Sequence, residues 1–432
     1  MKKLLIILVA LCLLVSFGCN SVHEGTTTNA GKVTEGKVTT SGKTDKTVEF
    51  YDGVIGENKS EGHGEEFGYE APEYVLDGAI RKTSGDMPGD YVIDGEYTIG
   101  GYDGQLKAGT LTAGEIKDLE DLEHWFSLWN ESKWDQVKKS RGLYAENVIT
   151  AKAPPMSEVK LVDGEKVLYS AVADINGRAI LIFNEQYKGK TAEVVVGDLS
   201  TEVTLVPGMG VDLKDIQPKS ATKLDLMLMI DTTGSMGDEL EYLKVELKDV
   251  IERVRKEQNI DIRLSVNFYR DEGDEYVVKY FDFREDIDDC ITILGEQYSF
   301  GGGDYPEAVH TAINNVLQHT WRPDAVKLCF FVLDAPPHEE SEINGINSEI
   351  LRDVTEMASQ GIRFISVVSS GADIEVEILM RSFAVMTGGT YLFLTNDSGI
   401  GGDHQEPDDT DYEVEPLNDC MVRVIKEFVF AD

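Results

Sequence analysis

The chain has 432 residues and is strongly acidic, with 79 acidic and 40 basic side chains and a formal net charge of −39. This charge argues against a nucleic acid partner, because binding to a phosphate backbone requires a basic surface. A basic protein partner or bound divalent cations fit the charge better, although the need to stay soluble explains it as well.

The amino terminus, residues 1–19, has the pattern of a secretion signal. Two lysines precede an apolar run from Leu4 to Val15, and this run is too short to span a membrane. Gly18-Cys19 follows the run and resembles a lipobox, which implies cleavage before Cys19 and a lipid on its sulfur. We therefore expect a protein anchored by this lipid outside the cytoplasm, at a bacterial membrane or cell surface. A plain cleaved signal and an uncleaved anchor are the alternatives.

Residues 20–68 are rich in Thr, Ser, Gly, Lys and Glu, and this composition predicts a disordered tether. The next segment, residues 69–142, predicts a small α+β unit. Thr112 and Glu115 have the spacing of a capping box and predict the start of a helix with an aromatic face. We expect this face to pack in a core or against another domain rather than to bind a ligand. It carries Leu119, Leu122, Trp125, Phe126 and Trp129.

Residues 143–218 predict a small all-β sandwich of short alternating strands. Asp163-Gly164 and Asn176-Gly177 separate apolar runs, and such pairs are typical of tight hairpin turns. The hairpin from Leu168 to Phe183 resembles the carboxypeptidase-regulatory-like sandwiches. This likeness implies a fold and assigns no functional residues.

Residues 219–432 predict an α/β domain, so the chain is expected to be multidomain. Strand and helix patterns alternate regularly, which favours a doubly wound, Rossmann-like parallel sheet with helices on both faces. The expected strands are 224–230, 262–269, 326–333, 363–369 and 391–394, with 276–283 as an antiparallel edge. The expected helices are 238–257, 306–318, 341–360, 375–386 and 417–430. The acidic stretch 397–415 is expected to be a mobile, solvated loop rather than a Ca²⁺ site.

Three polar motifs follow strands of this domain, where the carboxyl ends of parallel strands form one edge of the sheet. Asp231, Thr233 and Ser235 come directly after the first strand, and Asp334 follows the third. Asp304 lies in a Gly-rich loop between them. Ligands bind at this edge in open α/β sheets, and an all-oxygen ligand set suits a hard divalent cation. The alternative is that these side chains only cap helices and turns.

At these motifs the chain resembles the von Willebrand factor A domain family. The resemblance implies a metal-ion-dependent adhesion site in which Asp231, Thr233, Ser235, Asp304 and Asp334 hold Mg²⁺, or Mn²⁺ or Ca²⁺ in its place. It also implies that a protein partner binds at an open position of the metal. The better-known adhesive members carry Thr where this chain has Asp304. A third carboxylate would leave Mg²⁺ with a local charge of about −1, which disfavours an acidic partner ligand.

Three further residues are expected to support this site: Asp271 at the end of the second strand, Glu307 beside Asp304, and His338 after Asp334. Asp271 as an ordinary turn residue is the alternative. No phosphate-binding loop is present, and no cysteine or histidine spacing typical of zinc. We therefore predict a non-enzymatic surface protein that recognises a protein partner through its metal. The alternatives are a module in which the metal only stabilises the fold and, less favoured, a metal-dependent hydrolase with His338 as base.

Overall fold

The computed structural model describes residues 106–213, 217–257, 260–408 and 412–431, and the backbone of three short strands before them. Those strands are β1 (Tyr51–Asp52), β2 (Val75–Leu76) and β3 (Ala79–Ile80). The predicted signal peptide with Cys19, and all but two residues of the predicted tether, lie outside the described residues. Within the part of the chain that is described, no helix has the length and apolar character needed to cross a membrane.

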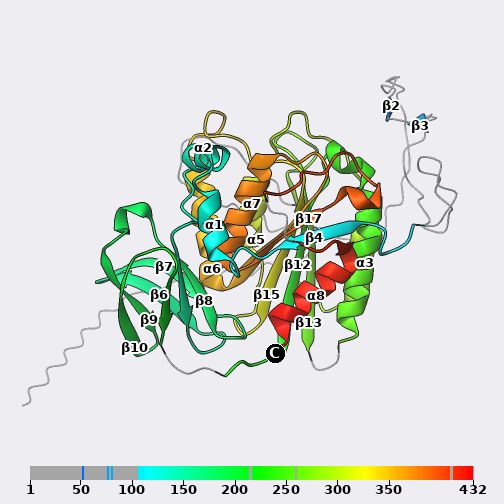
Figure 1. Cartoon of the computed structure of the whole chain (residues 1–432). Coiled ribbons are helices and arrows are strands. Elements are labelled where there is room, and N and C mark those ends of the chain that lie inside the picture. The colour runs from blue at the N-terminus through cyan, green and yellow to red at the C-terminus, as the bar shows by residue number, and fades with distance from the viewer. Residues whose placement is uncertain are drawn as a thin grey trace, which may run out of the picture. The chain divides into compact units, whose positions relative to one another are not determined.

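A nine-stranded mixed sheet forms the centre of the C-terminal region (Figure 1). Its strand order is β1-β14-β13-β12-β15-β16-β17-β4-β18. Five neighbouring strands run parallel, as predicted, namely β13 (Asp261–Tyr269), β12 (Lys223–Asp231), β15 (Val326–Leu333), β16 (Ile362–Val368) and β17 (Thr390–Leu394). The strands toward the edges are β14 (Val278–Tyr280), β4 (Thr112–Ile116) and β18 (Glu415–Pro416).

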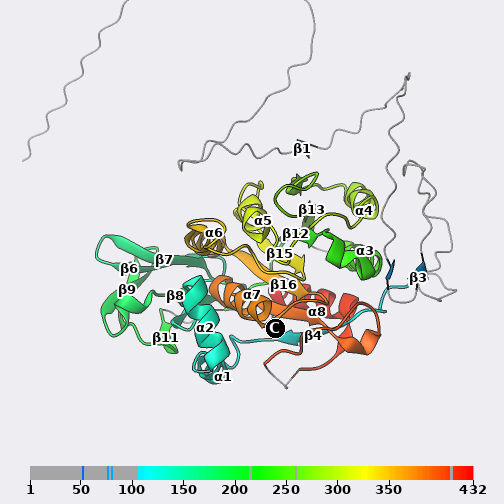
Figure 2. The same cartoon turned by 90° about the horizontal axis from the view of Figure 1, so that it is seen from above.

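Helices cover both faces of this sheet (Figure 1, Figure 2). One buried apolar cluster joins Leu226 and Leu228 of β12 to α3 (Leu240–Arg255), α4 (Ile287–Gly295) and α8 (Leu417–Val429). A second joins Met227 and Met229 to α5 (Val309–Val316), α6 (Ile346–Gln360) and α7 (Ile374–Thr387). Successive side chains of a strand point to opposite faces, so a strand that is apolar throughout supplies both cores. The predicted α/β layering is confirmed for this region.

Thr112 does not begin a helix, as its capping-box spacing predicted. Residues Thr112–Ile116 form β4, which pairs antiparallel with β17 at the edge of the sheet. Gly114 lies against the Phe393 ring, so closely that a Cβ atom would come within 2.5 Å of Phe393 Cζ. Long-range strand pairing thus overrides the local pattern, and part of the predicted segment 69–142 belongs to the sheet of the C-terminal region.

Two helices follow this strand, α1 (Leu122–Leu128) and α2 (Ser132–Arg141). The Asp121 side chain caps α1 by accepting from the backbone N–H of His124 at 3.0 Å. Trp125 and Trp134 are fully buried, and with Trp129 they form an edge-to-face cluster with ring centroids 5.3–5.6 Å apart. The prediction that the aromatic face packs in a core is confirmed.

Two small sheets lie between residues 148 and 212. One has the order β10-β9-β6-β7 and the other β11-β5-β8. The predicted turn at Asp163-Gly164 begins at the last residue of β6, and the predicted turn at Asn176-Gly177 directly precedes β8. Both glycines have positive φ. Arg363 of β16 donates to the carbonyl oxygen of Val172, which joins these sheets to the C-terminal region. The strands are β5 (Val148–Lys152), β6 (Glu158–Asp163), β7 (Lys166–Val172), β8 (Arg178–Ile182), β9 (Thr191–Val196), β10 (Leu199–Thr204) and β11 (Met209–Asp212).

Several predicted elements are shorter than expected, and the reason lies in contacts between distant residues. The helix expected from 306 begins only at Val309, because the backbone N–H of Glu307 donates to Pro336 O at 2.9 Å. The edge strand expected over 276–283 ends at Tyr280, and the Phe281 N–H donates to the Asn267 side chain instead. A 3-10 turn, η2 (Gly234–Asp238), precedes α3 and delays its start.

In the described part of the stretch 397–415, many residues are exposed as its composition predicted, but specific contacts hold the segment near His404. His404 is buried and its Nε2 lies 2.8 Å from Oε1 of Glu239, which is also buried. The backbone N–H of Gly371 donates to Asp403 O at 3.1 Å, and that of Gly402 to Ser370 Oγ at 3.1 Å. A buried carboxylate requires partners, and Glu239 finds one in this stretch.

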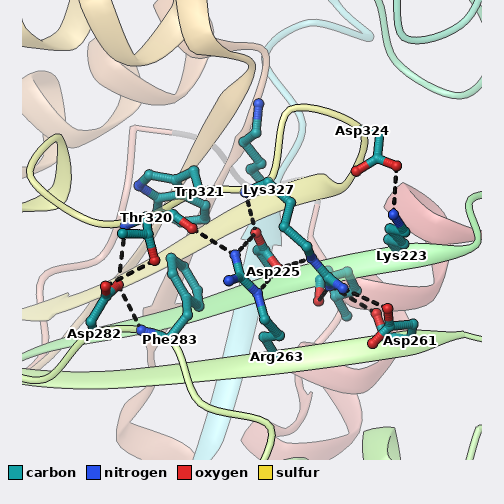
Figure 3. A network of polar contacts seen from close by, with 12 residues as sticks. Lys223, Asp225, Asp261, Arg263, Asp282, Phe283, Thr320, Trp321, Asp324 and Lys327 are labelled. Carbon is teal, nitrogen blue, oxygen red and sulfur yellow. Dashed lines mark hydrogen bonds and ion pairs between the residues drawn. The ribbon is translucent and has the colours of Figure 1, made fainter.

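The amino end of the sheet is closed by a network of ion pairs (Figure 3). Asp225 of β12 is fully buried, and its two carboxylate oxygens accept from Arg263 at 3.0 and 2.7 Å. The same oxygens accept from the side chain and the backbone N–H of Arg322 at 2.8 and 2.7 Å. Both oxygens of this carboxylate are therefore satisfied by the chain itself.

Candidate metal centre

Asp231, the last residue of β12, lies at the carboxyl edge of the sheet with Thr233 and Ser235 in the loop that follows. Asp231 Oδ1 accepts from the Thr233 backbone N–H at 2.8 Å and from its hydroxyl at 2.7 Å. The Thr233 and Ser235 hydroxyl oxygens are 3.2 Å apart. Asp231 and Thr233 are fully buried, yet Asp231 Oδ2 has no hydrogen-bond partner among the described residues.

Asp334 enters the same place from the neighbouring strand. It follows β15, which pairs in parallel with β12, so both aspartates end up at one edge. Its side chain is buried, and the Ser235 hydroxyl donates to it. Asp334 Oδ1 likewise has no hydrogen-bond partner in the described part of the chain. The structure thus brings together four of the predicted ligands, namely Asp231, Thr233, Ser235 and Asp334.

Glu307 supplies a third buried carboxylate. The backbone bond to Pro336 holds it beside the loop that follows Asp334, and the side chain is only 2% exposed. Its Oε2 atom is also without a partner among the described residues. The sequence assigned Glu307 only a supporting position, because an exposed loop acid and a buried one look alike in a sequence.

The pKa values of these three carboxyls are raised by burial and also by neighbouring negative charges. Burial and the neighbouring charges of Asp231, Asp271 and Asp334 raise the pKa of Glu307 to about 10. Burial and the charge of Asp231 raise the pKa of Asp334 to about 8. Burial raises the pKa of Asp231 to about 6. Such a group is stable only if protons or a cation neutralise it.

The donor set matches a hard divalent cation. Three buried carboxylates offer unpartnered oxygens, and two hydroxyls stand beside them. Mg²⁺, Mn²⁺ and Ca²⁺ prefer oxygen ligands of this kind. Asp231, Thr233, Ser235, Asp334 and Glu307 therefore fit such an ion, and the unpartnered oxygens are the observation on which this rests.

Asp304 is placed differently from the other predicted ligands. Its side chain is exposed, and its carboxylate lies within 4.8 Å of ligand atoms of His338 and Glu342. His338 Nε2 is 2.7 Å from Asp271 Oδ1, and His338 Nδ1 is 3.1 Å from Glu342 Oε2. Burial opposes a charged ring here, but the bonds to both acids leave the pKa of His338 raised. Asp304, Asp271 and His338 thus gather beside the buried carboxylates.

A glycine loop crosses the metal motif and fixes it. The N–H of Phe300 donates to Thr232 O at 3.0 Å, and that of Gly234 to Gly301 O at 3.1 Å. Gly301 has a φ of 83°, and a Cβ atom there would lie 2.3 Å from Asp274 Oδ1. Only glycine satisfies both the backbone conformation and this close approach.

Arg141 is a residue of this region that the sequence analysis missed. It ends α2 and is buried, and it donates to His338 O at 2.7 Å and to Pro337 O at 3.0 Å. These bonds hold the loop that follows Asp334. No local pattern marks Arg141, because its partners lie almost 200 residues away in the sequence.

The comparison with known families supports what this geometry indicates. The stretch 225–396 matches the pattern of the von Willebrand factor A domain. Residues 225–396 are a von Willebrand factor A domain. The family resemblance noted in the sequence is therefore confirmed for residues 225–396.

The curated relatives match between 27% and 32% of this chain. An ariadne-like RING finger protein of Acanthamoeba polyphaga mimivirus is 34% identical over 121 residues, which are 27% of this chain and 12% of that protein. The alpha-protein kinase vwkA of Dictyostelium discoideum is 26% identical over 117 residues, 27% of this chain and 19% of the kinase. The human von Willebrand factor A domain-containing protein 7 is 29% identical over 136 residues, 32% of this chain and 14% of that protein. The chain thus spans less than a fifth of the length of these relatives. Domains of this family commonly mediate protein–protein interactions and often bind a divalent metal.

Proposed function

We propose that the A domain binds a divalent cation, Mg²⁺ in the first place, and uses it to recognise a protein partner. The ligands are Asp231, Thr233, Ser235 and Asp334, with Glu307 as the third carboxylate. The observation that carries the proposal is the set of three buried carboxylate oxygens without a hydrogen-bond partner among the described residues. Bringing these charges together is costly unless a cation binds between them.

The chain prepares this site before any ion arrives. Thr233 fixes one oxygen of Asp231 through two hydrogen bonds and leaves the other free. Ser235 orients Asp334, and the backbone of Pro336 holds Glu307. When bound, the cation supplies a Lewis-acidic position that can accept an oxygen of a partner.

The surroundings of the site suit a partner that is neutral or basic. Phe300 and Tyr305 are 66% and 42% exposed, and they lie in the loop that crosses the metal motif. Tyr298, 49% exposed, precedes them. Exposed aromatic side chains are frequent anchors at protein interfaces. Three carboxylates on one divalent ion leave about one negative charge, which disfavours an acidic ligand group.

We further propose that the protein acts outside the cytoplasm and is not an enzyme. The lipobox-like Gly18-Cys19 supports a lipid anchor on Cys19, and the chain's net charge of −39 argues against nucleic acid. His338 has both ring nitrogens within hydrogen-bond distance of carboxylates, which does not favour the hydrolase alternative.

One observation favours a second role, in which the metal only stabilises the domain. Glu307 is buried and lies close to Asp231 and Asp334, so the ion could be enclosed by carboxylates and be a weak Lewis acid. In that case the partner would bind elsewhere, and its binding would not depend on the free metal position.

Calorimetric titration of Mg²⁺, Mn²⁺ and Ca²⁺ into the full chain tests metal binding. We expect saturable binding that is lost in Asp231→Ala and kept in Asp397→Ala, which removes an exposed acid. If the parent binds no cation at millimolar concentration, the metal proposal is wrong. Partner binding that survives a chelator would favour the structural role, and turnover on an ester or phosphodiester panel would favour the hydrolase.

A further inference from the structure

Asp304, His338 and Glu342 form a group of side chains that the Mg²⁺ site does not use. They come from two loops, and one ligand atom of each lies within 4.8 Å of the others. Asp304 and Glu342 are exposed, whereas His338 is 8% exposed. Two ligand atoms bound at about 2.1 Å to one tetrahedral Zn²⁺ ion lie about 3.4 Å apart, so the exposed carboxylates would have to rotate inward to bind one ion.

The histidine of this group is oriented as in metal sites. His338 Nε2 is 2.7 Å from Asp271 Oδ1, and Asp271 is itself buried. A carboxylate on one ring nitrogen fixes the tautomer and turns the other nitrogen toward the ion, an arrangement typical of metal-binding histidines. The other nitrogen, Nδ1, is the one that lies 3.1 Å from Glu342 Oε2.

The backbone around these ligands is fixed as well. Arg141 donates to His338 O and to Pro337 O at 2.7 and 3.0 Å. The backbone N–H of Glu339 donates to Glu342 Oε2 at 3.0 Å and restrains that side chain. Two of the three ligands, His338 and Glu342, are therefore held in place before an ion binds, and only Asp304 has to be ordered.

We propose that Asp304, His338 and Glu342 form a second cation site that takes Zn²⁺ or a similar transition-metal ion. One imidazole nitrogen with two carboxylates suits Zn²⁺ better than Mg²⁺, which prefers oxygen ligands alone. The two sites therefore select different ions and do not compete for the same residues. Three protein ligands leave one position of a tetrahedral ion for water or for a partner group.

The test uses the full chain without an affinity tag, with Mg²⁺ present throughout. Zn²⁺ is titrated calorimetrically, and Co²⁺ is titrated as a visible absorption probe. We expect one equivalent of Zn²⁺ with micromolar affinity or better, and a tetrahedral Co²⁺ spectrum. His338→Gln and Asp304→Asn should each weaken Zn²⁺ binding at least tenfold and abolish that spectrum.

Two controls separate this proposal from the Mg²⁺ proposal. Glu272→Gln changes an exposed acid at the same edge and should leave Zn²⁺ binding unchanged. Asp231→Asn should lose Mg²⁺ binding and keep the Zn²⁺ equivalent, whereas Asp304→Asn should do the reverse. Asp304 is exposed, so that variant keeps the fold intact even if His338→Gln does not.

Two results would overturn the second site. One is a parent chain that binds no Zn²⁺ equivalent while it still binds Mg²⁺. The other is Zn²⁺ binding that is the same in Asp304→Asn, His338→Gln and the parent. A parent that binds Zn²⁺ but no Mg²⁺ would contradict the proposed function and leave the second site standing.

Discussion

Strand β12 carries a buried aspartate near each end, and the two are treated in opposite ways. At the amino end, Asp225 accepts from Arg263 and Arg322 through both oxygens (Figure 3). At the carboxyl end, Asp231 has donors for one oxygen only, and its near neighbours Asp334 and Glu307 are acids. The same side chain in the same strand is thus neutralised by the chain at one end and left unneutralised at the other.

This contrast separates a stabilising group from a binding group. A buried carboxylate that pairs with two arginines has its charge and both oxygens satisfied within the protein, so it gains nothing from binding a ligand. A buried carboxylate among other carboxylates lowers the stability of the metal-free protein and gains most when a cation binds. Cation binding at the carboxyl edge should therefore increase the stability of the folded protein.

The largest effect is expected at the amino end. Asp225→Ala should reduce the free energy of unfolding by about 3–5 kcal/mol, because it leaves the mostly buried Arg263 without a paired carboxylate and leaves Arg322 with Asp261 alone. Urea denaturation measures this. Asp324→Ala, which breaks the exposed pair with Lys223 at 2.6 Å, is the control and should change little. An equal loss in both variants would contradict the special role of Asp225.

The next effect is expected at the carboxyl end and depends on metal. At a free Mg²⁺ concentration 100 times the dissociation constant, the parent should gain about 2.7 kcal/mol over the chelated protein. Asp231→Asn should gain nothing from Mg²⁺, and without metal it should be at least as stable as the parent, since it removes one of several like charges. Thermal unfolding with EDTA or Mg²⁺ gives both numbers. If Mg²⁺ stabilises Asp231→Asn as strongly as the parent, Asp231 is not a ligand of the ion.

A third prediction concerns pH in the absence of metal. Burial raises the pKa of Asp231 to about 6 and that of Asp334 to about 8, whereas an unfolded aspartate titrates at about 3.9. Between pH 4 and pH 8 the folded state therefore binds more protons than the unfolded state. The free energy of unfolding in EDTA should fall as the pH rises through this window, by at least about 1 kcal/mol. Asp231→Asn combined with Asp334→Asn should make the profile less steep and leave the part that comes from Glu307, whose pKa is raised to about 10 mainly by burial. A parent whose stability rises with pH would contradict the buried cluster.

The smallest effect is expected for Asp304→Thr. Since Asp304 is exposed and lies with His338 and Glu342, its loss should change Mg²⁺ affinity by less than about twofold, or about 0.4 kcal/mol. Glu307→Gln is the comparison and should change the affinity more, because Glu307 is buried beside Asp231. Calorimetry measures the Mg²⁺ affinity of both variants. A tenfold loss of affinity in Asp304→Thr would show that Asp304 is a ligand of Mg²⁺ after all.

The parts of the site that the sequence predicted are those that depend on local order. Asp231, Thr233 and Ser235 follow an apolar strand within five residues, and Asp334 directly follows another. Parallel neighbouring strands place such residues at one edge, so their convergence could be expected.

The parts that could not be predicted depend on contacts between distant segments. Glu307 rather than Asp304 is the buried acid because its backbone pairs with Pro336, and no pattern near Glu307 reports that pairing. Arg141 reaches Pro337 and His338 across almost 200 residues. The capping-box pattern at Thr112 was wrong for the same reason, since the neighbouring strand β17 decides its conformation.

Strand β4 covers a sheet edge that the A domain alone would leave open. The family pattern ends at residue 396, yet β17 is paired along its outer edge by β4, which lies more than 100 residues before the match begins. A module cut out at residues 225 and 396 would expose that edge, and open strand edges recruit other chains and aggregate. Glu246 of α3 also accepts from the backbone N–H groups of Gly109, Thr110 and Leu111. A fragment of this domain without residues 106–142 would therefore be prone to aggregate, and the two parts should be produced together.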